Sequence, residues 1–466
     1  MRRLFLLAIL PACGGPEVVE CVFPEPGAPV AEEVVEAAPV ELLSGPMLGH
    51  ATHREVTVWT ETDRPAAVTV RVWPTEAPGA SQIFSAEATH DNTHTARLTR
   101  LDPGVDYTYE LLIDGETSSF DYPLEFETPA LWLYRSEEDP RHTPPEFRVA
   151  MGSCTYINDP PYDRAGSPYG GGYHIFESVR ATEPDLMLWL GDNTYLRPGD
   201  WETRESISHR FENDRALPEL QPLLASAFNY AIWDDHDFGP NDSDRSFALR
   251  AEALDIFSNY WPNPHFGTPE APGAYSTFVW GDVQFFLLDD RYYRAPNDTP
   301  EGENKDFLGE QQLQWLIDGL TSSLSTFKIV VNGNQTLNDN TPYEAYGNFP
   351  EERDQLLSAV VDRGIEGVLF LSGDRHHTEL LQTESPGFYT LYDFTSSPLT
   401  SGAATAWQEL DNPQRVDGTL VTETRNFGTL DFAGPYGDRT VTLRTFDDQG
   451  AELWEFPISE HDLSVE

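Results

Sequence analysis

Positively charged residues are scarce in this sequence. Its 466 residues include 29 Lys and Arg against 78 Asp and Glu, which gives a formal net charge of −49 at pH 7. Such a surface repels phosphate backbones and anionic lipid headgroups, so the charge excludes nucleic-acid backbone binding and a basic membrane patch. Salt screens repulsion within a compact fold, so the composition favours a salty medium over the milder acidity of many exported proteins.

Cysteine and long apolar runs are also scarce. The three cysteines, Cys13, Cys21 and Cys154, are too few for a disulfide framework. No run after the N-terminus reaches the length that a membrane-spanning helix needs. Glycine and proline are plentiful but not periodic, which excludes a collagen-like chain.

The N-terminus has the pattern of an export signal. Arg2 and Arg3 precede the apolar run 4–10, so we expect residues 1–12 to be a signal peptide. Residues 10–13, Leu-Pro-Ala-Cys, resemble a bacterial lipobox, which implies lipidation of Cys13 and a lipid anchor to the membrane. The expected location is the cell envelope, as an outer-membrane lipoprotein or a periplasmic or extracellular protein. The two arginines fit a twin-arginine signal or an ordinary positive n-region, so the export route stays open.

The rest of the chain is rich enough in apolar residues to fold. Hydrophobic residues make up 39% and aromatic residues 12%, which is typical of a globular protein. Residues 13–44 are rich in Glu, Pro, Ala and Val and are predicted to be a tether. Residues 45–130 alternate apolar and polar side chains between turn signals, which predicts a β-sandwich of the fibronectin or immunoglobulin type.

The pattern changes in residues 146–458, after a charged, Pro-containing linker at 131–145. Helical patterns at 313–320 and 356–361 lie between short apolar runs, which indicates an α/β layered domain. The predicted buried strands are 147–151, 185–190, 228–233, 283–288, 328–331 and 367–371. Residues 420–458 return to strand patterns and are expected to add strands to the same sheets.

Polar clusters follow five of these predicted strands. Ligands in open α/β sheets sit beyond the carboxyl ends of the strands, so the five clusters should converge on one site. Each cluster alone is ambiguous, because Gly-Asp is common in turns and a lone cysteine is usually a small buried side chain. Together they form a metal-ligand set suited to two metals. The clusters are Gly152-Ser153-Cys154, Gly191-Asp192-Asn193-Thr194-Tyr195, Asp234-Asp235-His236-Asp237, Asn332-Gly333-Asn334-Gln335 and Ser372-Gly373-Asp374-Arg375-His376-His377.

In combination these motifs resemble the PhoD-type alkaline phosphatases of the calcineurin-like metallophosphoesterases. Residues 289–294, Asp-Asp-Arg-Tyr-Tyr-Arg, are similar to a further pattern of that family. Asp237 stands where many members have Glu, and Pro240 stands where many have Asn. The resemblance covers roughly residues 45–455. It implies an α+β or α/β chain, with the N-terminal β-sandwich followed by a layered αββα metallophosphoesterase domain.

The resemblance also implies the site residues. A ferric ion (Fe3+) would be bound by Cys154, Asp192, Tyr195 and His376, whose thiolate, phenolate and carboxylate suit a trivalent ion. Asp192 would bridge to a second, harder cation, expected to be calcium (Ca2+), with oxygen ligands. Those ligands are expected to be Asp235, Asn241, Asn334 and Asp374. His236 is the candidate general acid, and Arg291 is either a phosphate clamp or a structural ion pair.

The expected function is metal-dependent hydrolysis of phosphate esters, with attack by a hydroxide between the two metals. Monoesters and diesters both remain open as substrates, and a phosphodiesterase or phospholipase D-like hydrolase is an alternative with the same metal core. An alternative of another class is a surface lipoprotein whose metal site is structural. The sequence leaves the substrate, the second metal and the oligomeric state open.

Overall fold

The computed structural model describes residues 38–132, 143–160, 162–163, 168–302, 304–340 and 342–465. The predicted signal peptide, Cys13, most of the predicted tether and much of the predicted linker lie outside these residues. Residues 40–466 form one compact unit, to which the following description applies.

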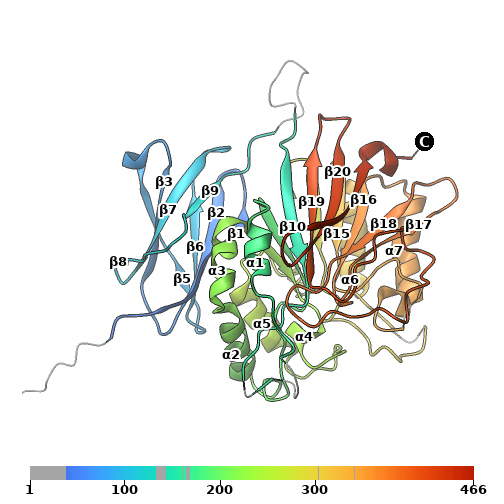
Figure 1. Ribbon diagram of the computed structural model, residues 1–466, viewed down its shortest axis with the longest axis horizontal. Coiled ribbons are helices and arrows are strands. Elements are labelled where there is room, and N and C mark those ends of the chain that lie inside the picture. Colours follow the sequence, from blue (N-terminus) through green and yellow to red (C-terminus); the bar gives the residue numbers. More distant parts are fainter. Residues whose placement is uncertain are drawn as a thin grey trace, which may run out of the picture. The chain divides into compact units, whose positions relative to one another are not determined.

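The N-terminal strands form the predicted β-sandwich (Figure 1). Its two sheets enclose Val56, Val58, Val70 and Leu98, all buried, because alternate residues of each strand point inward. One sheet contains β1 (Leu42–Ala51), β2 (Glu55–Thr62), β6 (Thr93–Thr99) and β5 (Glu87–Ala88). The other contains β4 (Gln82–Ser85), β3 (Val68–Pro74), β7 (Asp106–Ile113), β8 (Glu116–Thr117) and β9 (Glu125–Glu127).

Two larger sheets form the centre of the rest of the chain. The ten-stranded sheet has the order β21-β20-β19-β10-β11-β12-β1-β2-β6-β5, and the six-stranded sheet has the order β13-β14-β15-β16-β18-β17. In the first, the new strands are β10 (Phe147–Gly152), β11 (Leu186–Leu190), β12 (Phe228–Ile232), β19 (Asn426–Ala433), β20 (Thr440–Asp447) and β21 (Glu452–Ser459). In the second they are β13 (Ser276–Trp280), β14 (Val283–Leu287), β15 (Phe327–Val331), β16 (Val368–Ser372), β17 (Glu379–Thr383) and β18 (Leu391–Thr395).

All six buried strands expected from the sequence are present, with ends within one residue of the prediction. Strands β10, β11 and β12 are parallel neighbours, as are β14, β15, β16 and β18. The C-terminal strands join the ten-stranded sheet through the antiparallel pair of β10 and β19, as expected. Parallel strands place all their carboxyl ends on one edge of each sheet, which is where the predicted polar clusters begin.

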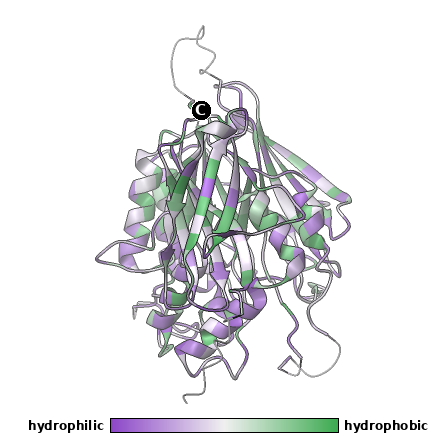
Figure 2. Cartoon of the chain, turned by 90° about the vertical axis from the view of Figure 1, so that its left-hand side faces the viewer, coloured by the Kyte–Doolittle hydropathy of each residue, from purple (hydrophilic) through white to green (hydrophobic). Residues whose placement is uncertain are grey.

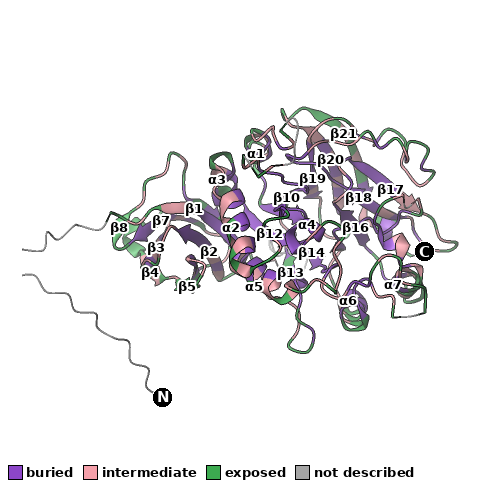
Figure 3. Ribbon diagram, turned by 90° about the horizontal axis from the view of Figure 1, so that it is seen from below, coloured by how far each residue is buried: buried purple, intermediate pink, exposed green. Residues whose placement is uncertain are grey.

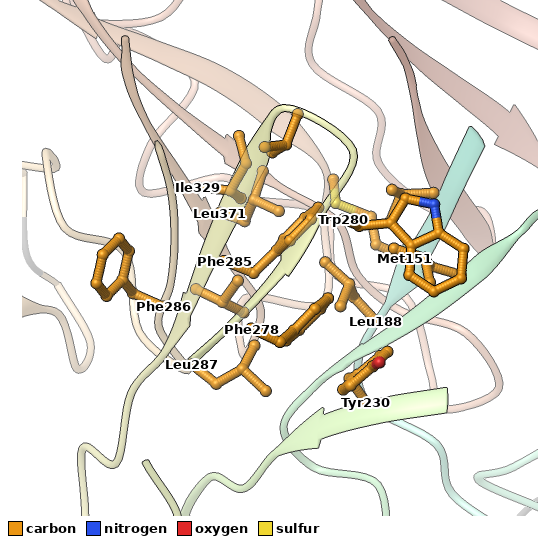
Figure 4. Close-up of a cluster of buried hydrophobic side chains, with 14 of the residues drawn as sticks. Met151, Leu188, Tyr230, Phe278, Trp280, Phe285, Phe286, Leu287, Ile329 and Leu371 are labelled. Atoms are coloured by element: carbon orange, nitrogen blue, oxygen red, sulfur yellow. The ribbon is translucent and has the colours of Figure 1, made fainter. Parts of the chain in front are cut away.

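The two sheets stack face to face through an aromatic and aliphatic core (Figure 4). The rings of Tyr230 and Phe278 stack with centroids 3.8 Å apart, and Phe278 stacks in turn on Phe285 at 4.7 Å. Met151 and Leu188 belong to the same buried cluster from the side of the ten-stranded sheet. In Figure 3 the central strands are mostly buried, whereas α2, α5, α6 and α7 around them carry intermediate and exposed residues, and in Figure 2 hydrophobic residues lie along many of the strands.

Helices cover the outer faces and complete the predicted αββα layering (Figure 1). Trp189 and Ala231 of the ten-stranded sheet share a buried cluster with α1, α2, α3 and α5, and Phe286 of the six-stranded sheet clusters with α6 and α7. The helices are α1 (Ile175–Arg180), α2 (Arg204–Arg215), α3 (Gln221–Ser226), α4 (Asp235–Phe238), α5 (Arg250–Tyr260), α6 (Glu310–Ser322) and α7 (Pro350–Asp362). Short 3-10 helices are η1 (Pro78–Ala80), η3 (Pro218–Leu220), η4 (Tyr346–Asn348) and η5 (Glu460–Leu463).

The sandwich and the layered region share one sheet, because β1 pairs in parallel with β12. Side chains strengthen this junction. Trp59 Nε1 donates to the backbone oxygen of Asn259 at 2.7 Å, and Tyr260 Oη donates to Glu61 Oε1 at 2.5 Å. Burial raises the pKa of Glu61 to about 8, although the Tyr260 hydrogen bond acts in the opposite direction. The Glu61 carboxyl is therefore protonated at neutral pH.

Within the described residues, no helix combines the length and the apolar character that crossing a membrane requires.

Candidate metal centre

The polar clusters predicted at the strand ends meet where the two stacked sheets approach each other. Glycine permits close backbone contacts at two points of this site. A Cβ on Gly373 would lie 2.5 Å from the backbone oxygen of Leu190, and one on Gly191 would lie 2.7 Å from Asp234 Cβ. Gly191 also has a φ of +91°, in the region that favours glycine. Gly373 therefore lets its loop approach the opposite sheet, and Gly191 lets the loops after β11 and β12 of one sheet approach each other.

Four predicted iron and calcium ligands have strained backbones. Cys154, Asp192, Asp374 and His376 have φ values of +60°, +53°, +66° and +55°, in the left-handed region that non-glycine residues rarely occupy. Each follows a buried strand of the central layers. Strain of this kind persists where the surrounding structure imposes it and is concentrated at functional sites.

All four predicted iron ligands lie together. Ligand atoms of Cys154, Asp192 and His376 lie within 4.8 Å of one another. Tyr195 Oη donates to Asp192 Oδ2 at 3.0 Å and lies 3.2 Å from His376 Nε2. The Cys154 and Tyr195 side chains are buried. One thiol, one phenol, one carboxylate and one imidazole thus converge on a single point.

The His376 ring is oriented for binding through Nε2. Its Nδ1 lies 2.7 Å from the backbone oxygen of Gly402. Because a carbonyl only accepts, Nδ1 carries the proton, and Nε2 is left as the basic nitrogen facing Tyr195 and Asp192. A carbonyl partner on the distal nitrogen is the usual arrangement behind a metal-ligating histidine.

The charges of this cluster call for a cation. Burial raises the pKa of the Cys154 thiol to about 11 and also raises that of Tyr195. Burial, followed by repulsion from Asp235, raises the pKa of Asp192. The deprotonated forms that would bind a metal are therefore costly here unless a positive charge joins them. A hard, highly charged metal ion fits this donor set, with the thiolate supplying the soft ligand.

A second ligand cluster overlaps the first. Asp192, Asp235 and His236 form one group of ligand atoms within 4.8 Å, and Asp234, Asp235 and Asp374 form another. Asp235 Oδ2 accepts from the backbone N–H of Asp242 at 2.7 Å, whereas its buried Oδ1 has no hydrogen-bond partner. A buried carboxylate oxygen without a partner fits an oxygen-rich cation site. Asp192 belongs to both clusters, as expected of a bridging ligand.

Asp237 holds the loops of the two clusters together. Its Oδ1 accepts from the backbone N–H groups of Asn193 at 3.0 Å and Thr194 at 3.1 Å. Its Oδ2 accepts from the N–H of Asp234 at 3.0 Å, in a capping box at the start of α4. The acid that departs from the family pattern thus positions the backbone of both ligand loops.

His236 lies beside Asp192 and Asp235 and lines the cavity. Its backbone N–H donates to Asp192 Oδ1 at 3.3 Å, and its ring centroid lies 4.2 Å from that of Tyr195. It lines a cavity of about 560 Å³ with Asp192, Asp235 and Asp374. Asn241, predicted for the second cation, is an exposed residue at the same cavity.

Two predicted site residues lie away from the cavity. Arg291 is fully buried, and its guanidinium donates to Asp234 Oδ1 at 2.6 Å and to Glu344 Oε2 at 2.8 Å. The structure therefore favours the ion-pair alternative for Arg291 over the phosphate clamp. The Asn334 Oδ1 accepts from Arg294 at 2.9 Å, and its amide group donates to Asp234 at 3.2 Å. In this arrangement Asn334 offers no oxygen to a metal.

Arg375 reaches the cavity in place of Arg291. It lines the cavity, pairs with Glu409 and donates to the backbone oxygen of Glu344 at 3.2 Å, while its Nε has no hydrogen-bond partner. Sequence reasoning missed its role, although Arg375 lies inside the Gly373-Asp374-x-His376 motif. Its position between the two predicted ligands Asp374 and His376 was the available signal.

The stacked sheets and the ligands at the strand ends define a metallophosphoesterase-like fold. Residues 150–441 match the family model of the PhoD-like phosphatases, and residues 39–130 match that of a domain of unknown function. The chain belongs to the PhoD-like phosphatase family.

A curated relative agrees with this assignment. The chain is 24% identical over 325 residues to alkaline phosphatase D of Bacillus subtilis (strain 168). That match covers 58% of this chain and 53% of the relative, so the chain spans about half the length of the curated relative it matches.

Two solved structures share the fold. A structure of PhoD is similar with a TM-score of 0.68 and 17% identity, covering 89% of this chain and 91% of that one. A purple acid phosphatase from yellow lupin (Lupinus luteus) seeds has a TM-score of 0.64 and 14% identity, covering 90% and 75%.

Proposed function

We propose that this protein is a metal-dependent phosphoric ester hydrolase of the alkaline phosphatase D type. The observation that carries the proposal is the pair of overlapping ligand clusters that share Asp192 at one cavity. The names of the family and of its Bacillus subtilis relative support phosphate esters as the substrate class.

The proposed metals are Fe3+ and Ca2+. Cys154, Asp192, Tyr195 and His376 would hold the iron, and Asp235 and Asp374 would provide oxygen ligands for the second cation beside Asp192. Asn241 remains a proposed ligand at the cavity edge. When bound, the two cations supply Lewis-acid stabilisation of the phosphoryl oxygens and activation of water.

His236 is proposed as the proton donor to the leaving oxygen. It lines the cavity beside the ligand clusters, and its backbone is fixed by the bond to Asp192. General-acid assistance is typically about 10²–10⁴-fold and matters most for poor leaving groups. His236→Ala should therefore slow hydrolysis of an alkyl phosphate far more than that of a nitrophenyl phosphate, with the metal content unchanged. Equal losses, or a lost metal, would place His236 among the ligands instead.

Arg375 is proposed to bind a phosphoryl oxygen, the role first expected of Arg291. Its planar guanidinium is held by Glu409 and lines the cavity, and its buried Nε has no hydrogen-bond partner. Arg375→Lys keeps the charge but loses the fork, so KM should rise while the protein stays folded. Arg291→Lys should instead lower stability, because Arg291 pairs with two buried carboxylates. Thermal unfolding and steady-state kinetics of both variants separate the two roles.

A phosphodiesterase is the second candidate, and the charge of the cavity wall favours it. Asp242 lines the cavity along with the proposed ligand aspartates, and no ion pair of the described residues includes it; the lining Glu344 and Glu409 pair with Arg291 and Arg375. A diester carries one negative charge and a monoester carries two near neutral pH, so repulsion penalises the diester less. The measurement is kcat/KM for p-nitrophenyl phosphate against bis(p-nitrophenyl) phosphate. A metal-loaded protein that hydrolyses no ester would favour the alternative of a lipoprotein with a structural metal site.

Export and lipid anchoring are proposed from the N-terminal pattern alone. The run 4–10 and Cys13 support a cell-envelope lipoprotein that would face substrates outside the cytoplasm.

A further inference from the structure

Two exposed aromatic side chains lie at the cavity of the metal centre. Trp407 is 71% exposed and Tyr343 is 56% exposed, and both line the cavity. All eleven tryptophans are described, and Trp407 is the one that is exposed. A large aromatic surface left in water beside a binding cavity is typical of a contact site for a ligand.

The two aromatics come from different loops that are tied together. Tyr343 lies after β15 and Trp407 after β18. Tyr343 Oη donates to Oε1 of Gln408 at 3.2 Å, and Gln408 directly follows Trp407 in the chain. The Arg375 guanidinium carbon lies 5.0 Å from the Tyr343 ring centroid. The ring of Tyr343 is thus fixed against the same arginine that is proposed to bind phosphate.

We propose that the leaving group of the substrate is a nucleoside, whose base stacks on Trp407 and Tyr343 while its phosphate lies by Arg375. This inference rests on the proposed function and specifies its substrate class. A base is planar and uncharged at neutral pH, so the acidic surface does not repel it, and stacking on an aromatic side chain suits every base. In the reaction, water adds to phosphorus, the P–O5′ bond breaks, phosphate is released and the 5′ oxygen takes up a proton to give the nucleoside.

An apolar membrane contact is the competing explanation. Leu410 is 55% exposed three residues after Trp407, so the loop also presents aliphatic surface. Leu410 does not line the cavity, however, and Trp407 and Tyr343 do. The position of the aromatics at the cavity therefore favours a bound ring over a lipid surface.

The test compares adenosine 5′-monophosphate with ribose 5-phosphate, which share one leaving oxygen and differ in the base. Metal-loaded wild-type protein should prefer the nucleotide by about 10-fold or more in kcat/KM, the gain expected from stacking one base. Trp407→Ala should remove most of this preference, and Trp407→Phe should retain part of it. Leu410→Ala is the matched control and should leave the preference and the activity unchanged.

Adenosine binding gives a readout that does not depend on hydrolysis. Adenosine should quench the tryptophan fluorescence of wild-type protein, and this quenching should be weaker in Trp407→Phe, where the exposed indole is gone. The inference would be overturned if wild type and Trp407→Ala had the same ratio of kcat/KM for the two phosphates and adenosine did not bind. It would also be overturned if Trp407→Ala changed only the binding of zwitterionic lipid vesicles. Hydrolysis of neither phosphate by a protein that still cleaves p-nitrophenyl or bis(p-nitrophenyl) phosphate would also overturn the inference. If those two esters are inert as well, the proposed function is refuted instead, and adenosine binding then decides whether the aromatic pair binds a base.

Discussion

Replacing Asp237 by alanine removes the acceptor of three backbone amides at the metal centre. The amides belong to Asn193, Thr194 and Asp234, and Asp237 is fully buried. Burial raises the pKa of Asp237 to about 7, although the three amides favour its charged form. At pH 8 the side chain is therefore largely ionised, and its hydrogen bonds are charge-assisted.

The loss of stability in Asp237→Ala follows from the number of backbone amides left without a hydrogen-bond acceptor. A buried donor without an acceptor costs about 1–3 kcal/mol, so Asp237→Ala should lower the free energy of unfolding by about 3–5 kcal/mol, allowing for some water entry. In Asp237→Asn the amide oxygen replaces Oδ1 and still accepts from the N–H groups of Asn193 and Thr194. The amide nitrogen replaces Oδ2, so the hydrogen bond from the N–H of Asp234 is lost. Asp237→Asn should therefore lower the free energy of unfolding by about 1–3 kcal/mol.

Urea unfolding at pH 8 measures both losses, and Glu205→Ala, an exposed acid on α2, is the control. Iron binding should weaken in the same order, because the loop that Asp237 holds carries Asp192 and Tyr195. An alanine variant within 1 kcal/mol of wild type, or an asparagine variant as unstable as alanine, would refute this reasoning.

Three further predictions concern the metal, the junction and the anchor. Tyr195→Phe should abolish a visible phenolate-to-iron band of the iron-loaded protein; an unchanged spectrum would exclude Tyr195 as a ligand. The folded-state pKa of Glu61 is about 8 and its ordinary value is 4.5, so its stabilising contribution is present below pH 4.5 and is lost as the pH rises through 8. Glu61→Gln should therefore raise the melting temperature relative to wild type at pH 9 but not at pH 4.5; a gain at pH 4.5 alone would contradict this sign. Cys13→Ser should move the protein out of the membrane fraction, and unchanged detergent partitioning would count against lipidation.

Local patterns in the sequence predicted much of the fold. Short apolar runs such as 186–190 form buried parallel strands because every side chain in them is apolar. The Gly and Asp residues that follow, Gly191 and Asp192, end this strand sharply. The helix over residues 310–322 follows its leucine spacing, with Leu313, Leu316 and Leu320 buried. The pairing of β1 with β12 had no local signal, since it depends on contacts between residues far apart in the chain.

The clustering of the proposed ligand residues was more predictable than the contacts of the residues around them. Cys154 and Asp192 stand directly after strands, where topology alone brings them together. The burial of Arg291 was not predictable, because its partners Asp234 and Glu344 lie on distant segments. The exposure of Trp407 was equally hidden, because its loop has no periodic pattern that indicates a buried or exposed face.

Hydrolysis of two phosphate esters by the metal-loaded protein is the most direct test of the proposed metal-dependent phosphoric ester hydrolase. The rate on p-nitrophenyl and bis(p-nitrophenyl) phosphate is compared for wild type, Asp192→Asn and Asp214→Asn, the last an equally buried acid away from the cavity. We expect wild type to hydrolyse at least one ester and to lose this activity on metal chelation. Activity should fall by at least about 100-fold in Asp192→Asn and be retained in Asp214→Asn. A fully metal-loaded wild type that hydrolyses neither ester, or an Asp192→Asn variant as active as wild type, would contradict it.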